Sequence, residues 1–260
     1  LESRPGADGT IGAGVVARSA PDGYTLLIIP TNLAIYPALY RNLPFDPQRD
    51  FAPVTKLVAT QTVLLANPAL PVNSVMDLIK LAQAKPGSLN FGGSGAASIL
   101  QITMQLLLSM TGMDIRAIPY KGDGPVMTAL IAGEVDLAML PFGASLPQIK
   151  SGKVRVLGVS SSRRSPSLPD VPTIREAGFP GAESSLWYGI SGPAGIPRPI
   201  VSAMNAALNS YLTSPEGVKR LDDVGLLSRR GSTVEEFTAF IAEEFAKLQP
   251  VIRENNISTE

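Results

Sequence analysis

The stretch that most constrains the fold is 88–110, SLNFGGSGAASILQITMQLLLSM, which passes from apolar residues through a glycine-rich tract into a long apolar run. Leu89 to Phe91 predict a short strand, and Gly92 to Ala97 predict a loop. The following residues predict a helix with a single narrow polar stripe, formed by Ser98, Gln101, Gln105 and Ser109. A helix that is apolar on nearly all other sides is buried. The stretch therefore predicts a small-residue loop that places a buried helix N-terminus at the end of a strand.

This loop is a candidate cradle for a carboxylate. The first N–H groups of a helix have no intrahelical partner, and the aligned peptide dipoles place partial positive charge beside them. Glycine and alanine allow an anion to approach that backbone closely. The candidate ligand-binding residues of this cradle are Gly93, Ser94, Gly95, Ala96, Ala97 and Ser98.

Three other interpretations of the same tract stay open at this point. It loosely resembles a phosphate or dinucleotide fingerprint, but it lacks the G-x-G-x-x-G spacing and any following Gly-Lys-Ser/Thr. It also resembles a G-x-S-x-G nucleophile elbow whose last glycine is Ala96, which would make Ser94 a nucleophile. That role needs a base, and the chain contains no histidine, although a Ser-Lys pair is formally possible. The third interpretation is a tight turn packed for structural reasons.

Composition excludes several function classes. Lys plus Arg and Asp plus Glu are both 22, so charge gives no reason to expect nucleic acid or an anionic membrane as a partner. With no Cys and no His, thiolate catalysis, disulfides, zinc sites and Ser-His-Asp chemistry are excluded. No apolar run is long enough to span a bilayer, so direct membrane insertion is not expected. A chain of 260 residues is long for one domain, and we expect two.

Strands alternate with helices along the chain, which favours parallel α/β sheets. Ser74 with Asp77, and Thr233 with Glu236, are spaced as helix capping boxes. Gly112 and Gly133 are placed to end helices. The predicted strands are 24–29, 54–66, 89–91, 115–120, 135–140, 154–160 and 187–191. The predicted helices are 11–20, 74–84, the helix ended by Gly112, 125–132, 145–151, 200–213 and 233–255, with a helical turn near 173–177.

Seven motifs occur in order along the chain. They are RPGADGTIGA (4–13), APDGYTLL (20–27), LNFGGSGAAS (89–98), PYKGDGP (119–125), AGEVDLAM (132–139), SRRSPSLPDVPTIREAGFPG (162–181) and WYGISGPAGIP (187–197). In order and spacing they resemble the Bug family, the extracytoplasmic solute-binding proteins of tripartite tricarboxylate transporters. Each motif alone is unspecific, but the resemblance runs through essentially the whole chain.

The resemblance implies an α/β type II periplasmic-binding-protein fold, with two lobes and a ligand cleft between them. We expect one lobe from 1–56 plus 182–260 and the other from 57–181. The implied function needs no catalysis and no cofactor: the protein captures a small carboxylate in the periplasm and delivers it to a membrane permease. Alternatives are a ligand-sensing module for a membrane receptor and a Ser94-dependent hydrolase. The chain would be exported, with its signal peptide outside this sequence.

Further candidate ligand contacts lie outside the cradle. Thr31 and Asn32 follow a strand, where they either contact a ligand or cap a turn. Tyr120 would hydrogen-bond the ligand, and Trp187 would belong either to the cleft or to the core. For Lys121 we favour a structural pairing with Asp123 or Asp136, and Asp136 itself reads as an acceptor that braces the fold. At the far end of the pocket the resemblance places Leu140, Pro141 and Phe142.

Three departures from the family pattern bear on these expectations. Members begin with a strand, a glycine-rich loop and a helix that are missing here, so we expect this sequence to be a truncated form of a longer protein. Leu33 and Ala34 stand where a histidine is common. Leu140 to Gly143 replace a stretch that often carries an acidic residue. Because a buried ammonium needs an anionic partner, we expect a mono-, di- or tricarboxylate, aliphatic or aromatic, rather than an amino acid.

Overall fold

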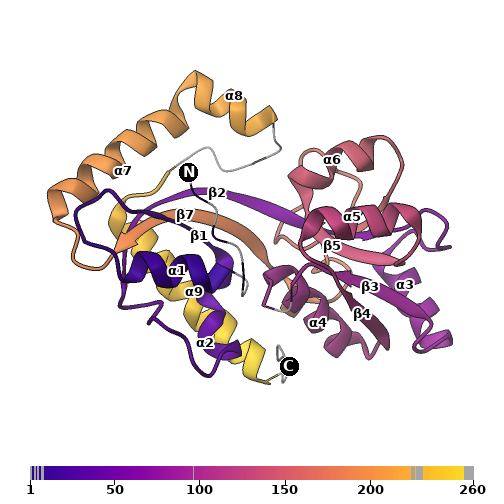
Figure 1. The fold of residues 1–260 in the computed structure, drawn as a ribbon. Coiled ribbons are helices and arrows are strands. Elements are labelled where there is room, and N and C mark those ends of the chain that lie inside the picture. Colours follow the sequence, from indigo (N-terminus) through magenta and orange to yellow (C-terminus); the bar gives the residue numbers. More distant parts are fainter. Residues whose placement is uncertain are drawn as a thin grey trace. The chain divides into compact units, whose positions relative to one another are not determined.

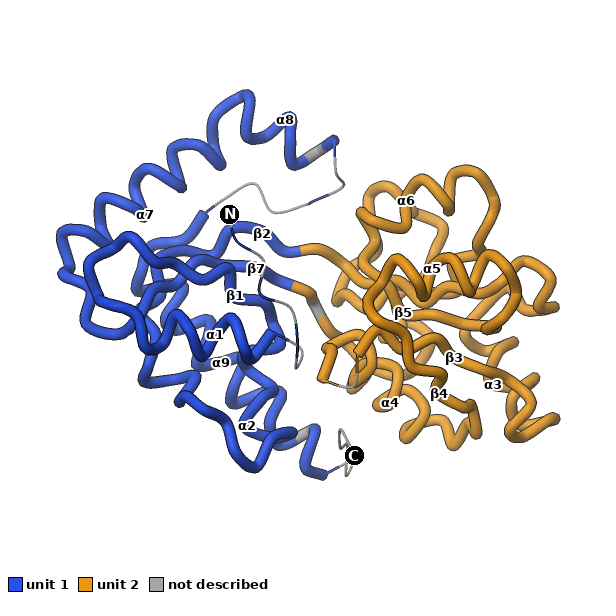
Figure 2. Tube along the Cα trace, in the orientation of Figure 1, with its two compact units in different colours: residues 1–59, 187–260 blue, residues 60–186 orange. Residues whose placement is uncertain are grey.

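The computed structural model describes residues 2, 4, 6, 9–95, 97–223, 226 and 231–254. The chain forms two compact units (Figure 2), unit 1 from Leu1–Ala59 with Trp187–Glu260 and unit 2 from Thr60–Leu186. It passes from one unit to the other within two strands, β2 (Phe51–Ala66) and β7 (Ser185–Pro193). The sequence places these passages near Lys56 and Gly181, a few residues before the divisions that the contacts define.

Unit 2 is built on a mixed sheet. Strand β3 (Leu89–Gly93) lies parallel to β4 (Ile115–Pro119) on one side and to β5 (Leu137–Pro141) on the other. The end of β2 pairs antiparallel with both β5 and β6 (Arg155–Val159). The expectation of a parallel sheet is therefore correct for β3, β4 and β5 but wrong for β2. Helical crossovers keep β3, β4 and β5 in one direction, whereas β2 continues from unit 1 and runs the opposite way.

Helices α3 (Val75–Ala84), α4 (Ile99–Thr111), α5 (Asp123–Ala132) and α6 (Phe142–Lys150) complete unit 2 with the short η3 (Pro180–Ala182). Ser74 caps α3 by accepting the Asp77 N–H at 3.1 Å, and the Asp77 carboxylate accepts the Asn73 N–H at 3.1 Å. Gly112 and Gly133 end their helices at φ 65° and 76°, in the left-handed region that glycine adopts readily. These predicted helix boundaries are confirmed.

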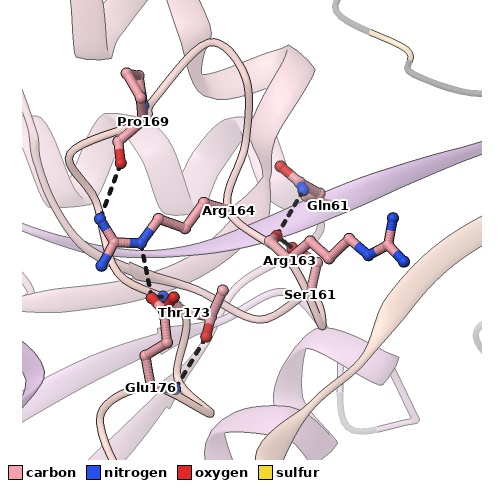
Figure 3. A network of polar contacts seen from close by, with 7 residues as sticks. All are labelled: Gln61, Ser161, Arg163, Arg164, Pro169, Thr173 and Glu176. Atoms are coloured by element: carbon pink, nitrogen blue, oxygen red, sulfur yellow. Dashed lines mark hydrogen bonds and ion pairs between the residues drawn. The ribbon is translucent and has the colours of Figure 1, made fainter.

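The long loop after β6 is fixed by a network of polar contacts (Figure 3). The Arg164 guanidinium donates to Glu176 at 2.8 Å and to the Pro169 carbonyl at 3.0 Å. Glu176 also accepts the Thr173 N–H at 2.9 Å, while its own N–H donates to the Thr173 hydroxyl at 3.0 Å. This reciprocal pair is a capping box, and it holds the helical turn predicted near 173–177.

Unit 1 pairs β1 (Leu27–Pro30) antiparallel with β7. Its helical elements are α1 (Thr10–Ala17), η2 (Thr31–Ala34), α2 (Tyr36–Leu39), α7 (Arg198–Thr213), α8 (Pro215–Asp223) and α9 (Val234–Glu254). Helix α9 packs against η2 and α2 (Figure 1). Thr233 and Glu236 form the predicted capping box, with each backbone N–H donating to the other side chain at 2.9 and 3.1 Å.

Two details of unit 1 differ from the prediction. The strand predicted from Tyr24 begins only at Leu27, because the Tyr24 N–H donates to Asp22 Oδ1 at 3.0 Å and keeps that residue in a turn. The Tyr24 side chain is 93% exposed as a result. Helix α8 is absent from the prediction, because its short polar sequence carries no long apolar stripe.

Each unit has its own hydrophobic core. In unit 2 the core joins buried residues of β2, α5, β5 and the start of α6, including Leu65, Leu130, Leu140 and Phe142. In unit 1 Trp187 meets Phe237 and Phe240 edge to face, with ring centroids 5.8 and 5.3 Å apart. Phe237 and Phe245 are buried, which confirms the prediction that the α9 phenylalanines pack in the core. Throughout the part of the chain with described structure, no helix combines the length and apolarity needed to cross a membrane.

Candidate ligand-binding site

Two loops of unit 2 meet where parallel strands end. In the pairing of β3 with β4, Gly93 lies opposite Pro119, so the loops that follow start side by side. The Tyr120 N–H donates to the Gly93 carbonyl at 2.8 Å and extends the ladder by one bond. Ser94 and Gly95 therefore leave the sheet beside Tyr120 and Lys121 at the carboxyl ends of the strands, the position where α/β sheets bind ligands.

Gly92 and Gly93 at the end of β3, and Gly95 in the loop that follows, have little room or an unusual backbone conformation. A Cβ on Gly92 would lie 2.9 Å from a methyl carbon of Val126, and one on Gly93 would overlap the amide oxygen of Gln101. Gly95 has φ 143°, a conformation that residues with a side chain rarely adopt. Gly92 and Gly93 are buried, with the Gln101 amide directly beside Gly93, whereas Gly95 is partly exposed.

Helix α4 begins after this loop as the sequence predicts. Ser98 is its N-cap, and the Ser98 hydroxyl accepts the Leu100 N–H at 3.2 Å. The helix is buried along most of its length, including Leu100, Ile102 and Met104, which confirms the predicted buried helix. Ser98 therefore serves the helix through its side-chain oxygen. Ala97 is buried, and Ala96 lies outside the described residues.

Ser94 contacts a residue that the sequence analysis did not place at the site. Its side chain lies beside the carboxyl group of Asp123, the first residue of α5. Burial raises the pKa of Asp123 above its ordinary value, and the neighbouring Ser94 side chain opposes that rise. The signal available in the sequence was the acidic residue in PYKGDGP, one loop away from the cradle.

Tyr120 and Lys121 differ in how the fold uses them. The Tyr120 ring is half-buried against the core of unit 2, and its hydroxyl forms no hydrogen bond with any residue whose structure is described. Lys121 is exposed, and within the described chain it forms no ion pair with Asp123 or Asp136. The predicted structural pairing of Lys121 is therefore wrong. Asp136 does brace the fold as predicted, because its carboxylate accepts the Asn90 N–H at 2.7 Å.

The residues proposed for the far end of the pocket lie in the core. Leu140 and Phe142 are each 1% exposed and pack within the hydrophobic cluster of unit 2, and Pro141 between them is buried. The Pro141 carbonyl accepts the Ser145 hydroxyl at 2.8 Å, which closes the first turn of α6. In this structure these three side chains pack inside unit 2 and do not form the accessible surface at the strand end.

Thr31, Asn32 and Trp187 belong to unit 1, where the fold itself uses two of them. The Trp187 N–H donates to the Thr31 hydroxyl at 2.8 Å, and that hydroxyl lies 3.3 Å from the Trp187 carbonyl. The indole N–H of Trp187 donates to Glu244 Oε2 at 2.9 Å, and the side chain is fully buried. The structure favours the core alternative for Trp187 and a structural role for Thr31, while Asn32 lies half-buried in η2.

A cavity of about 630 Å³ lies elsewhere, between α1 and β1 in unit 1. Its walls include the aliphatic side chains of Val15, Val16 and Leu26. The guanidinium of Arg4, which also borders it, is paired with Glu2 at 2.9 Å. The lining also includes the hydroxyl-bearing Ser19, Thr25 and Tyr36. We take the strand ends of unit 2 as the candidate site because the predicted cradle lies there. Within the described residues no group of three or more carboxylates is placed to hold a metal ion.

An α/β chain that passes twice between two units, and carries a small-residue loop and a capped helix at its strand ends, has the architecture of a periplasmic substrate-binding protein. The chain belongs to the family described as "Tripartite tricarboxylate transporter family receptor", whose sequence model matches residues 1–257. This family, with its solved members, comprises substrate-binding proteins and not enzymes, so the hydrolase alternative for Ser94 is set aside.

Relatives and solved structures agree with this assignment. The chain is 34% identical to "Protein BugT" of Bordetella pertussis over 98% of its own length and 78% of that protein. A structure titled "R. palustris Rpa4515 with adipate" matches with a TM-score of 0.90 and 34% identity, over 98% of this chain and 85% of the other. "MatC (Rpa3494) from Rhodopseudomonas palustris with bound malate" matches with a TM-score of 0.86 and 32% identity, over 95% and 85%. The Bug-family resemblance and the periplasmic-binding-protein fold are thereby confirmed.

Proposed function

We propose that this protein is a periplasmic solute-binding protein that captures a small carboxylate and delivers it to the membrane permease of a tripartite tricarboxylate transporter. The observation that carries the proposal is the cradle after β3, in a chain whose similar structures hold adipate and malate. The ligand class is a mono-, di- or tricarboxylate of small size.

The chemistry of the cradle supports a carboxylate. Gly95 is partly exposed and has no side chain to keep an anion from the backbone, and the loop leads directly into the N-terminus of a 13-residue helix. The Gln101 amide, which carries two N–H donors, lies beside the same strand end. Backbone donors and neutral side chains can bind a carboxylate here without a buried basic residue.

Calorimetric titration of the ligand-stripped protein tests this function. The panel contains adipate, succinate, malate, citrate, terephthalate, nicotinate, aspartate and glutamate. We expect saturable binding of at least one carboxylate, and a loss of roughly tenfold or more in affinity when Ser94→Leu places a bulky side chain in the cradle.

The matched control is Ser88→Leu, a serine that is exposed at the opposite end of β3. It should leave the affinity unchanged, and circular dichroism should show that both variants fold. Absence of binding across the panel, or equal binding by the Ser94→Leu variant, would overturn the proposed function.

A further inference from the structure

The parallel pairing of β3 with β4 places Asp123 beside the cradle. Strands β3 and β4 are parallel neighbours in register, so the residues that follow Gly93 and Pro119 leave the sheet together. Asp123 opens α5 only four residues after β4 ends, and its carboxyl group reaches the Ser94 side chain. An acidic group therefore borders the loop that we propose to bind a carboxylate.

Within the described chain, Asp123 has no basic partner. The carboxyl group is half-buried, and no described Lys or Arg forms an ion pair with it. Lys121, the nearest basic residue in the sequence, is exposed and unpaired within the described chain. The polar neighbour of the Asp123 carboxyl group is the Ser94 side chain, and burial raises the pKa of Asp123 because the charged form loses solvation.

Such a group favours some carboxylates over others. An ionised carboxylate accepts hydrogen bonds and donates none, so Asp123 repels a ligand that brings only negative charge to this place. A ligand with a hydroxyl or ammonium group next to its bound carboxylate would instead donate a hydrogen bond to Asp123. A charge-assisted bond of this kind is among the stronger ones in proteins.

We propose that Asp123 is a specificity-determining residue, which accepts a hydrogen bond from a hydroxyl or ammonium group on the carbon next to the ligand's bound carboxylate. The favoured ligands are therefore 2-hydroxy or 2-amino carboxylates. This inference rests on the proposed function. It also revises the expectation that amino acids are disfavoured, since that expectation considered only the acidic residue missing near Leu140.

The test compares ligands that differ by the donor group alone. Malate and aspartate are each titrated against succinate, which lacks the donor but keeps both carboxylates. We expect the wild type to bind malate or aspartate roughly tenfold or more tightly than succinate. The variant Asp123→Ala should lose that preference while it keeps, or gains, affinity for succinate, which also shows that the variant folds.

Two more variants sharpen the test. Glu134→Ala removes the same charge from an exposed position just beyond the other end of α5, and should leave the preference intact. Asp123→Asn keeps an acceptor oxygen without the charge, so it should abolish a preference for an ammonium group and retain much of one for a hydroxyl group.

The outcomes separate the two proposals. Equal affinities for the matched ligands in the wild type, or a preference that survives Asp123→Ala, would overturn the role of Asp123 and leave the carboxylate site standing. If neither these ligands nor the wider panel bind, the proposed function fails and the role of Asp123 fails with it.

Discussion

Two strand ends of this protein look alike in sequence and differ in structure. In unit 1, β1 ends at Pro30 and is followed by Thr31, whose hydroxyl is bonded to the backbone of Trp187. In unit 2, β3 ends at Gly93 and is followed by Ser94 and Gly95, which are both partly exposed. The comparison teaches that a polar residue at a strand end is not sufficient for a site. What decides is whether the fold leaves that residue accessible: Thr31 is fully buried, whereas Ser94 is partly exposed.

Other polar groups of unit 1 also have partners inside the unit. Glu244 accepts the Trp187 indole N–H, and the Lys56 ammonium lies 4.1 Å from the centre of the Phe240 ring. Burial lowers the pKa of Lys56, while the nearby Glu244 carboxylate opposes that shift. These groups stabilise one another inside the unit, as an aromatic and ionic cluster packed on α9.

The largest expected effect is in unit 1, where Trp187 and its partners are buried. Trp187→Ala should lower the free energy of unfolding by about 3–5 kcal/mol, because it leaves a cavity and removes the partner of Glu244. Urea denaturation measures the change. Tyr24→Ala, at an aromatic residue that is 93% exposed, is the matched control and should change stability little. A comparable loss in both variants would contradict the core role of Trp187.

In unit 2, the loop after β3 depends on the backbone conformation of Gly95. Gly95→Ala should cost about 1–3 kcal/mol, because φ 143° strains any residue with a side chain. Gly124→Ala, in the first turn of α5, meets no atom within 4 Å and should be neutral or slightly stabilising. Thermal unfolding of both variants checks the contrast. If Gly95→Ala is as stable as the wild type, the loop does not require the observed conformation.

The ionised carboxylate of Asp123 should lower the stability of the protein at neutral pH. Its pKa is raised above the ordinary 3.8, so folding favours the protonated form. The protonated carboxyl group contributes its full stability when the pH is below the ordinary pKa. This contribution declines as the pH rises through the raised pKa. Asp123→Asn should therefore melt at a higher temperature than the wild type at neutral pH.

That difference should shrink as the pH falls toward the ordinary pKa of Asp123, which melting curves across the acidic range would measure. A variant that is less stable than the wild type at neutral pH would show instead that the ionised carboxylate braces the loop.

The smallest expected effect is at the surface of unit 2. Arg164→Ala should cost only about 0–1 kcal/mol, because its ion pair with Glu176 is exposed to solvent. Glu176→Ala should cost more, since Glu176 also accepts the Thr173 N–H and its pKa is lowered mainly by that bond. Stability that depends on ionised Glu176 is lost as the pH falls below its ordinary value of 4.5. Urea denaturation of both variants near neutral pH measures the order, and a reversed order would contradict the capping role of Glu176.

Local signals carried most of what the sequence predicts correctly. The pairs Ser74 with Asp77 and Thr233 with Glu236 mark helix starts because capping involves residues three apart. The glycine tract before α4 predicts the loop for the same reason, since its requirement for small residues is local.

The sequence could not decide the points that depend on distant residues. The direction of β2 depends on its passage from the other unit, which no local pattern records. The burial of Phe142 and Trp187 depends on packing partners far away in the sequence. Asp123 was considered only as a partner for Lys121, because its proximity to Ser94 follows from the pairing of β3 with β4.

The measurement that tests the central claim most directly is a crystal structure of the protein with the tightest-binding member of the carboxylate panel. We expect the ligand carboxylate on loop 94–98, within about 3.2 Å of donors there, and its hydroxyl or ammonium group directed at Asp123. A ligand whose carboxylate lies away from this loop, for instance in the cavity between α1 and β1, would contradict the account.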